Sequence, residues 1–276
     1  MTAPSGIQYP SGFRFGAAYA IDQTTGRLKG TSASIPYTGE RFVGAKAWTL
    51  SIPKQRRIFH VDADRVGAAD FLPPTETASG QIAVSADNMT LDEILTGNKK
   101  VTIGNAATIA AQTSNQGFEP FVGLLLWQQS INYVSRLRTW RSFLIPRAKA
   151  VPMDAGAGDK EVDGNYDILM TPSTANMFGV NITTAIDGAT DAQYFKTMTS
   201  GRPMIAAWIG DGYTDEFTLQ YNVNGTLTAA PAIDVASIAV YVNGVLQSSG
   251  ITKVASKFTF DTAPLVTDDI AAFWEY

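Results

Sequence analysis

The sequence has no cysteine and a single histidine, His60, among its 276 residues. Without cysteine, neither a disulfide framework nor a thiolate metal site can form, so stability has to come from packing or from assembly. A Ser-His-Asp triad would have to use His60, yet no Gly-x-Ser-x-Gly sequence accompanies it. No glycine-rich phosphate-binding motif follows a predicted strand either. We therefore expect no enzymatic activity, no cofactor and no bound metal.

Charged residues are also scarce, at 17% of the chain, against about 25% in average domains. This composition indicates either a surface that largely meets other protein, or a β-rich chain that is simply rich in Ser, Thr and Asn. The strongest apolar run, residues 121–127, is too short to span a bilayer. The first residues lack the charged and apolar regions of a signal peptide. We expect a soluble protein made in a cytoplasm, without membrane contact.

The net charge of −4 is divided unevenly along the chain. Residues 1–150 carry 16 Lys/Arg and 10 Asp/Glu, whereas residues 151–276 carry 5 and 15. The first part is therefore net basic and the second strongly acidic. Such asymmetry favours head-to-tail contacts between copies of the chain. The first part is less basic than is typical of a nucleic-acid-binding domain.

Residues 205–276 show the alternation of apolar and polar residues that is typical of half-buried strands. Every second residue of Phe217–Val223 is apolar, and the Asn224-Gly225 pair that follows favours a tight hairpin turn. Ile238–Val242 repeats the pattern and is followed by Asn243-Gly244. The chain ends in the same rhythm, with aromatic residues at alternate positions. These residues predict a small C-terminal β-sandwich module.

Residues 1–204 are predicted to form a larger, mainly β domain. Its expected strands are residues 13–22, 39–52, 81–85, 121–133, 141–151 and 167–170. Residues 1–12 are polar and predict an arm, and residues 201–203 predict the linker to the C-terminal module. Residues 53–80 show no clear periodicity, which indicates either a long loop that contacts partners or a hairpin whose alternation is hidden.

One short helix is predicted from Thr90. The sequence Thr90-Leu-Asp-Glu93 is a capping box, in which the threonine hydroxyl accepts the backbone N–H of Glu93. Met89 and Ile94 are spaced as a hydrophobic staple, and Gly97 should end the helix. A second short helix is expected over residues 191–198.

Two groups of charged residues are candidates for contacts between copies of the chain. Basic and acidic residues alternate in the 53–80 segment, and a basic cluster that includes Trp140 lies further on. The basic cluster could instead contact a nucleic-acid backbone, or it could be a solvated strand face. The candidate oligomer-interface residues are Lys54, Arg56, Arg57, Asp62, Asp64, Asp70, Arg136, Arg138 and Arg141.

Taken together, these features resemble those of bacteriophage major tail proteins, the subunits of tail tubes. The resemblance depends on the mainly β domain, the capped helix at residues 90–95, the loop at 53–80 and the polar arm, and it covers roughly residues 1–204. Residues 240–247, 258–264 and 268–270 are similar to small β-modules of phage fibres and virion proteins. The resemblance implies a tail-tube-like β-sandwich or barrel with one short helix. It also implies an immunoglobulin-like decoration module at residues 205–276.

The function implied by the resemblance is structural. Subunits of that family close hexameric rings, and the rings stack into a tube that conducts DNA without sequence specificity. The partners would be further copies of the chain, other phage tail proteins and the passing DNA. The protein would be made in the bacterial host cytoplasm and end in the virion. One feature departs from the family, because tube lumens are generally acidic whereas residues 1–150 are net basic; we expect those cations to meet acidic patches of neighbouring subunits.

The alternative is a receptor- or carbohydrate-binding tail fibre protein, an adhesin. In such a protein the C-terminal aromatic residues would be binding platforms. The candidates are Trp208, Tyr213, Tyr241, Trp274 and Tyr276. Aromatic residues that alternate along strands are more often core residues, so we expect most of these side chains to be buried.

Overall fold

The computed structural model describes residues 8–42, 45–51, 57–59, 70–72, 78–84, 89–97, 99–103, 107–111, 120–132, 137–152, 164–182, 191–223 and 226–276. Within these ranges, no helix is both long enough and apolar enough to cross a membrane.

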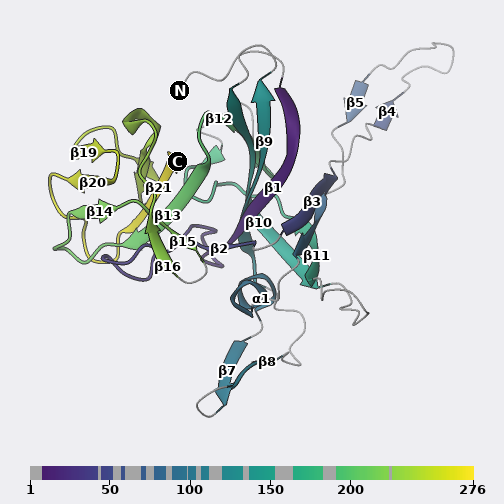
Figure 1. Cartoon of the computed structure of the whole chain (residues 1–276), viewed down its shortest axis with the longest axis horizontal. Helices are drawn as coiled ribbons and strands as arrows, with labels where there is room; N and C mark the ends of the chain where they lie inside the picture. The colour runs from purple at the N-terminus through teal and green to yellow at the C-terminus, as the bar shows by residue number, and fades with distance from the viewer. Residues whose placement is uncertain are drawn as a thin grey trace.

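The largest sheet contains eight strands and forms the body of the N-terminal part (Figure 1). Seven of them follow the spatial order β2 (Glu40–Arg41), β1 (Gln8–Ala20), β9 (Val122–Asn132), β10 (Arg138–Pro152), β11 (Gly164–Met170), β6 (Ser79–Val84) and β3 (Ala45–Ser51). The eighth, β12 (Phe195–Thr199), pairs with the first half of β10, while β11 pairs with the second half. All neighbouring strands are antiparallel.

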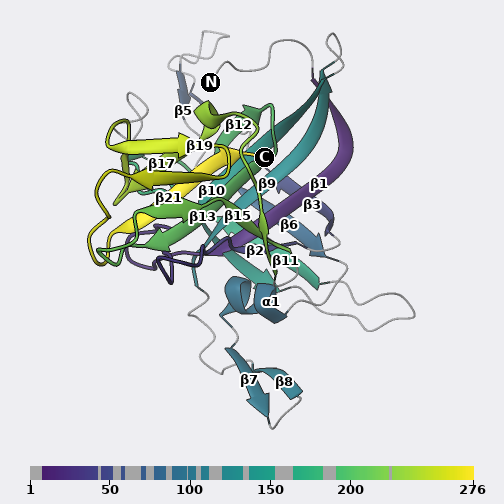
Figure 2. The ribbon, with the colours of Figure 1, turned by 60° about the vertical axis from the view of Figure 1, so that its left-hand side comes forward.

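This sheet curls around its own hydrophobic core. In Figures 1 and 2, β3 lies beside β1 although the two strands are far apart in the strand order. The helix α1 (Met89–Thr96) covers one end of the curled sheet and buries Leu91 and Leu95. These leucines share a core with Trp48 and Phe143, whose rings meet edge to face at 5.6 Å. The helix is therefore held by tertiary packing, as a helix of two turns must be.

The strand β9 is buried on both faces. Leu124 and Leu126 point into the core of the curled sheet, whereas Leu125 and Trp127 belong to a separate core on the opposite face. Successive residues of a strand point to opposite faces, so burial on both sides requires a continuous apolar run. The apolar run at residues 121–127, which is too short to span a membrane, therefore leads into and forms the first part of this doubly buried strand.

The C-terminal part contains two further sheets, seen at the left of Figure 1. One has the order β13 (Pro203–Ile209), β21 (Asp269–Glu275), β17 (Ala239–Val242) and β18 (Val245–Leu246); the other has the order β14 (Glu216–Thr218), β20 (Lys257–Phe260) and β19 (Ile251–Val254). A two-stranded ladder, β15 (Gln220–Val223) with β16 (Thr226–Ala229), and a short 3-10 helix, η1 (Val235–Ser237), complete this part.

Aromatic side chains fill the space between these two sheets. Trp208 meets the rings of Phe217 and Phe258 edge to face, and those two phenylalanine rings stack at 5.3 Å. The buried indole of Trp274 donates a hydrogen bond to the Ala230 carbonyl at 2.8 Å. The alternation read from the C-terminal sequence therefore produces a compact aromatic core.

The opposite face of the β13 and β21 strands packs against the curled sheet. Ile205, Ala207 and Ala271 lie in one core with Leu125 and Trp127. The chain is thus built in three layers: the curled sheet, the β13–β21 sheet and the outer sheet.

Backbone contacts reinforce the junction between the first two layers. Tyr37 and Ala207 exchange two backbone hydrogen bonds, at 2.7 and 2.8 Å. The rings of Phe178 and Tyr241 stack at 4.9 Å across the same junction. A segment of the N-terminal part therefore adds directly to the edge of β13.

The prediction of a mainly β fold with a β-sandwich-like arrangement and a short helix is confirmed. The helix ends as predicted at Gly97, whose φ is +78° and whose N–H bonds to the Glu93 carbonyl. The prediction that Thr90 is the N-cap of the helix is wrong, because α1 begins at Met89 and Thr90 lies within its first turn. The Asn243-Gly244 turn is confirmed, with φ of 50° and 85°, which is typical of the tight turn that such a pair favours.

The second predicted helix, over residues 191–198, is wrong. Residues 195–199 form the strand β12, which pairs with residues 140–144 of β10. Without β12, the edge of this half of β10 that faces away from β9 would have unpaired backbone donors and acceptors. Completing this ladder outweighs the weak helical pattern.

The expected arm, residues 1–12, overlaps β1 from Gln8 onward, and residues 1–7 lie outside the described residues. Within the 53–80 segment, the structure describes β4 (Arg57–Phe59), β5 (Asp70–Leu72) and the beginning of β6. The expected boundary between residues 204 and 205 falls inside β13.

Substituting Gly244 should weaken the junction between the layers. A Cβ atom on Gly244 would lie 2.5 Å from the Gly179 carbonyl oxygen, and the φ of Gly244 is positive. Gly250 also has a positive φ, but a Cβ atom there would have nothing within 4 Å. We expect Gly250→Ala to cost about 1 kcal/mol from backbone strain alone, and Gly244→Ala to cost roughly twice that or more. Urea denaturation measures both; equal losses would mean that the close contact contributes nothing.

Alkaline pH should also weaken this junction. Tyr37 accepts the Ala20 backbone N–H at 2.6 Å, and burial raises the pKa of its phenol to about 12. Burial likewise raises the pKa of Tyr19. An unfolded tyrosine titrates near 10, so between pH 10 and about 12 the unfolded chain releases protons that the folded chain retains. The free energy of unfolding must therefore fall as pH rises through this window.

Denaturation curves measured across that window test this pH dependence. Tyr37→Phe should flatten the decline, whereas Tyr213→Phe, at a side chain that is 90% exposed, should leave the slope unchanged. A decline with the same slope in all three proteins would contradict the assignment.

Candidate interaction sites

Two hairpins project from the layered body. The β4–β5 pair and the pair β7 (Lys99–Ile103) with β8 (Ala107–Ala111) extend away from the three layers in Figure 1. Each is a separate two-stranded sheet that pairs with no other strand of the described chain. An isolated two-stranded hairpin is at best marginally stable in water. Both hairpins therefore offer strand edges for backbone pairing with a partner.

The predicted interface residues are distributed between described and undescribed parts. Lys54, Arg56, Asp62, Asp64 and Arg136 lie outside the described residues, as does His60. Arg57 and Asp70 lie on the two strands of the β4–β5 hairpin, where Arg57 is opposite Leu72 and Asp70 is opposite Phe59. The structure therefore brings these two onto one projecting element.

Arg138 and Arg141 do not share a surface. They are three residues apart on β10, in a stretch of regular register, so their side chains leave opposite faces of the strand. Arg138 is exposed, beside the exposed side chain of Leu137. Arg141 instead lies over the Phe143 ring, with its guanidinium carbon 4.8 Å from the ring centre and its Nε buried. A single basic patch on β10 is therefore not formed by this pair.

The aromatic residues proposed as binding platforms are mostly not accessible. Trp208 and Trp274 are 1% and 0% exposed in the core of the C-terminal part. Tyr241 is half-buried against Phe178, as described above. Tyr213 is 90% exposed, and Tyr276 is partly exposed. The expectation that most of these side chains are core residues is confirmed for the two tryptophans.

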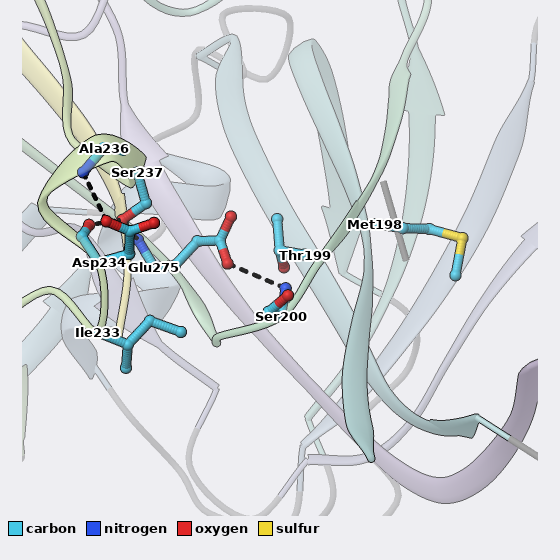
Figure 3. Close-up of a pocket in the computed structure, with 8 residues that line it drawn as sticks. All are labelled: Met198, Thr199, Ser200, Ile233, Asp234, Ala236, Ser237 and Glu275. Atoms are coloured by element: carbon cyan, nitrogen blue, oxygen red, sulfur yellow. Dashed lines mark hydrogen bonds between the residues drawn. The ribbon is translucent and has the colours of Figure 1, made fainter. Parts of the chain in front are cut away.

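A pocket of about 300 Å³ lies where the end of β12 meets the C-terminal part (Figure 3). It is lined by Met198, Thr199, Ser200, Ile233, Asp234, Ala236, Ser237 and Glu275. This pocket could not be predicted from the sequence, because its two sides come from segments that are more than thirty positions apart.

The Glu275 carboxylate is the central charged group of the pocket. It is buried, and its Oε2 accepts the backbone N–H groups of Ser200 and Gly201, both at 2.9 Å. Figure 3 shows this side chain reaching from the C-terminal part to the connection between β12 and β13. A carboxylate that accepts two backbone N–H groups is well stabilised where it is buried. Glu275 therefore fastens the connection to the last strand.

Asp234, Ser237 and Thr199 of the pocket are also hydrogen-bonded to the backbone. Asp234 accepts the Ala236 N–H at the start of η1, and Ser237 donates to the Asp234 carbonyl at 2.6 Å. Thr199 donates to the Gly201 carbonyl at 2.7 Å. No lining hydroxyl is hydrogen-bonded to a side chain that could take its proton, as a catalytic nucleophile requires. The pocket is a structural joint between the two parts of the chain.

Metal binding finds no support in the described part of the chain. It contains no group of three or more His, Cys, Asp or Glu side chains placed to hold an ion.

The sequence matches no known family model, and no curated protein matches it. Any assignment of function therefore depends on the residues and the geometry above.

Replacing Glu275 should loosen the connection at residues 200–201. Glu275→Ala leaves two N–H groups without their acceptor, and each unpaired buried group costs about 1–3 kcal/mol. Glu275→Gln keeps one acceptor oxygen and should cost less. Asp261→Ala, at an exposed position, is the matched loss of an acid and should stay within about 0.5 kcal/mol of the parent. Equal stability of Glu275→Ala and the parent in urea denaturation would show that this clamp is unimportant.

Proposed function

We propose that this chain is a structural virion protein, the subunit of a bacteriophage tail tube. In this proposal copies of the chain form closed rings, most simply hexamers, and the rings stack into a conduit for DNA. The protein is made in the host cytoplasm, has no catalytic role, and contacts DNA without reading its sequence. Its partners are further copies of itself and other tail proteins.

The observation that carries the proposal is the pair of projecting hairpins, β4–β5 and β7–β8. Neither belongs to the three-layered body, and each leaves its outer strand edges unpaired among the described residues. Strand edges of this kind add readily to the sheet of another chain. A subunit with two such extensions is suited to repeated contacts with neighbouring copies.

Three further features support an assembling structural role. The fold is stabilised without disulfides, and the only pocket discussed above holds the chain together instead of exposing reactive groups. The net charge changes from basic in the first part of the sequence to acidic in the second, which favours attraction between copies. The resemblance to tail proteins described from the sequence agrees with the mainly β architecture and the short packed helix.

The fibre or adhesin alternative receives less support. Its candidate platforms Trp208 and Trp274 are inaccessible, and of the five only Tyr213 is largely exposed. A single exposed tyrosine is a small platform for a glycan. The tail-tube proposal is therefore the one that we retain.

Removing the β7–β8 hairpin tests the proposal. Replacing residues 99–111 by a short Gly/Ser linker should leave a folded subunit, because β7 and β8 form a separate two-stranded sheet that pairs with no other strand of the described chain. The variant should fail to form rings or tubes that the parent forms in electron micrographs. Circular dichroism and urea denaturation check that the variant is folded.

A variant that introduces a charge on the outer sheet is the control for this experiment. Val254 is partly exposed on β19, and Val254→Asp should leave rings and tubes unchanged. A parent protein that remains monomeric at every concentration and salt tested, or a hairpin variant that assembles normally, would refute the proposal.

A further inference from the structure

Two arginines meet at the junction between the curled sheet and the C-terminal part. Arg41 lies on β2, and Arg202 immediately precedes β13. The guanidinium carbons of both lie over the ring of Tyr221 on β15, at 5.2 and 5.1 Å from its centre. Arg41 also lies 5.8 Å from the Trp127 ring centre, and Arg202 lies 4.9 Å from that of Tyr276.

Neither guanidinium has an acidic partner among the described residues. No ion pair or hydrogen bond joins either one to another described side chain. The acid next to Arg41 in the chain and the acid opposite Pro203 in the β13–β21 ladder are both directed elsewhere. Glu275 accepts the amides of Ser200 and Gly201, and Glu40 leaves the face of β2 opposite to Arg41.

Several donors at this place are buried without an acceptor. They are the Nε and Nη2 of Arg202 and the indole Nε1 of Trp127. Buried donors are nearly always paired in folded proteins, if not with protein then with water or an ion. Burial, and then the positive charge of Arg202, lower the pKa of Arg41. Two like charges in a partly buried setting are costly unless an opposite charge joins them.

The aromatic rings do not satisfy these donors. Cation–π attraction acts on the charge of the guanidinium and supplies no hydrogen-bond acceptor, so it leaves the N–H groups available. Tyr221 and Tyr276, whose rings are 5.6 Å apart, therefore orient the guanidinium groups without using their hydrogen-bonding capacity. The in-plane donors match the oxygen pairs of carboxylate and phosphate groups.

We propose that Arg41 and Arg202 form an oxyanion site that binds a carboxylate or phosphate group. The group comes either from a free ion or from an acidic side chain of a second copy of the chain. The excess of acids in residues 151–276 makes a second copy a ready source. The site is independent of the tail-tube proposal, and either can fail without the other.

Titration with inorganic phosphate, at an ionic strength kept constant with chloride, tests this site. The parent protein should show a saturable rise in melting temperature and a saturable broadening of the phosphate ³¹P resonance. Arg41→Gln and Arg202→Gln should each weaken binding roughly tenfold or more, the loss expected for one charge-assisted pair. Lys29→Gln, which removes an exposed positive charge elsewhere, should bind phosphate like the parent.

Further measurements allow for a variant that does not fold, and they distinguish a free ion from an acidic side chain of a second copy. If Arg202→Gln does not fold, Arg202→Lys can replace it. This variant keeps the positive charge but loses the paired N–H donors of the guanidinium, and should bind phosphate more weakly than the parent. Acetate should compete with phosphate. If phosphate also dissociates copies of the chain, the natural group is a side chain of a second copy; if self-association is unchanged, it is a free oxyanion. Absence of saturable phosphate binding to the parent, or equal binding by the parent and both glutamine variants, would overturn the proposal.

Discussion

Burial of the same strands on both faces is the constraint on which the rest of the structure depends. β9 faces the curled core with Leu124 and Leu126 and the junction with Leu125 and Trp127. β13 and β21 in turn face both the junction and the aromatic core of the C-terminal part. Because a strand alternates its side chains, neither layer can be removed without exposing apolar residues to water. The C-terminal part is accordingly a structural layer of the protein as well as a compact unit with its own core.

The same constraint explains where unsatisfied groups remain. The layers are filled by side chains, and the pocket between them uses its carboxylate and hydroxyl groups to hold the backbone. Two places are left for interaction: the strand edges of the two projecting hairpins, and the partly buried guanidinium groups of Arg41 and Arg202 at the junction between the layers.

Much of the strand pattern could be predicted from the sequence, because strand alternation and turn residues are local. The alternation after residue 269, the Asn243-Gly244 turn and the stop at Gly97 each depend on a few adjacent residues. The β12 strand was missed because its outcome depends on the free edge of β10, which lies more than fifty positions away. The arginine pair was missed for the same reason, since its residues come from distant segments that only the fold brings together. The separation of Arg138 and Arg141 was also missed, because the strand was predicted to begin at residue 141 whereas β10 begins at Arg138, and residues three apart in one strand point to opposite faces.

Amide hydrogen exchange on the β7–β8 hairpin, compared between free subunits and assembled protein, tests the assembly proposal most directly. Free subunits should exchange these amides nearly as fast as an unfolded peptide, because a lone two-stranded ladder opens readily. Assembly should slow the exchange by roughly a hundredfold or more if the ladder gains a partner strand, while β9, already buried, serves as the unchanged reference. Fast exchange of the hairpin amides in fully assembled protein would contradict the account.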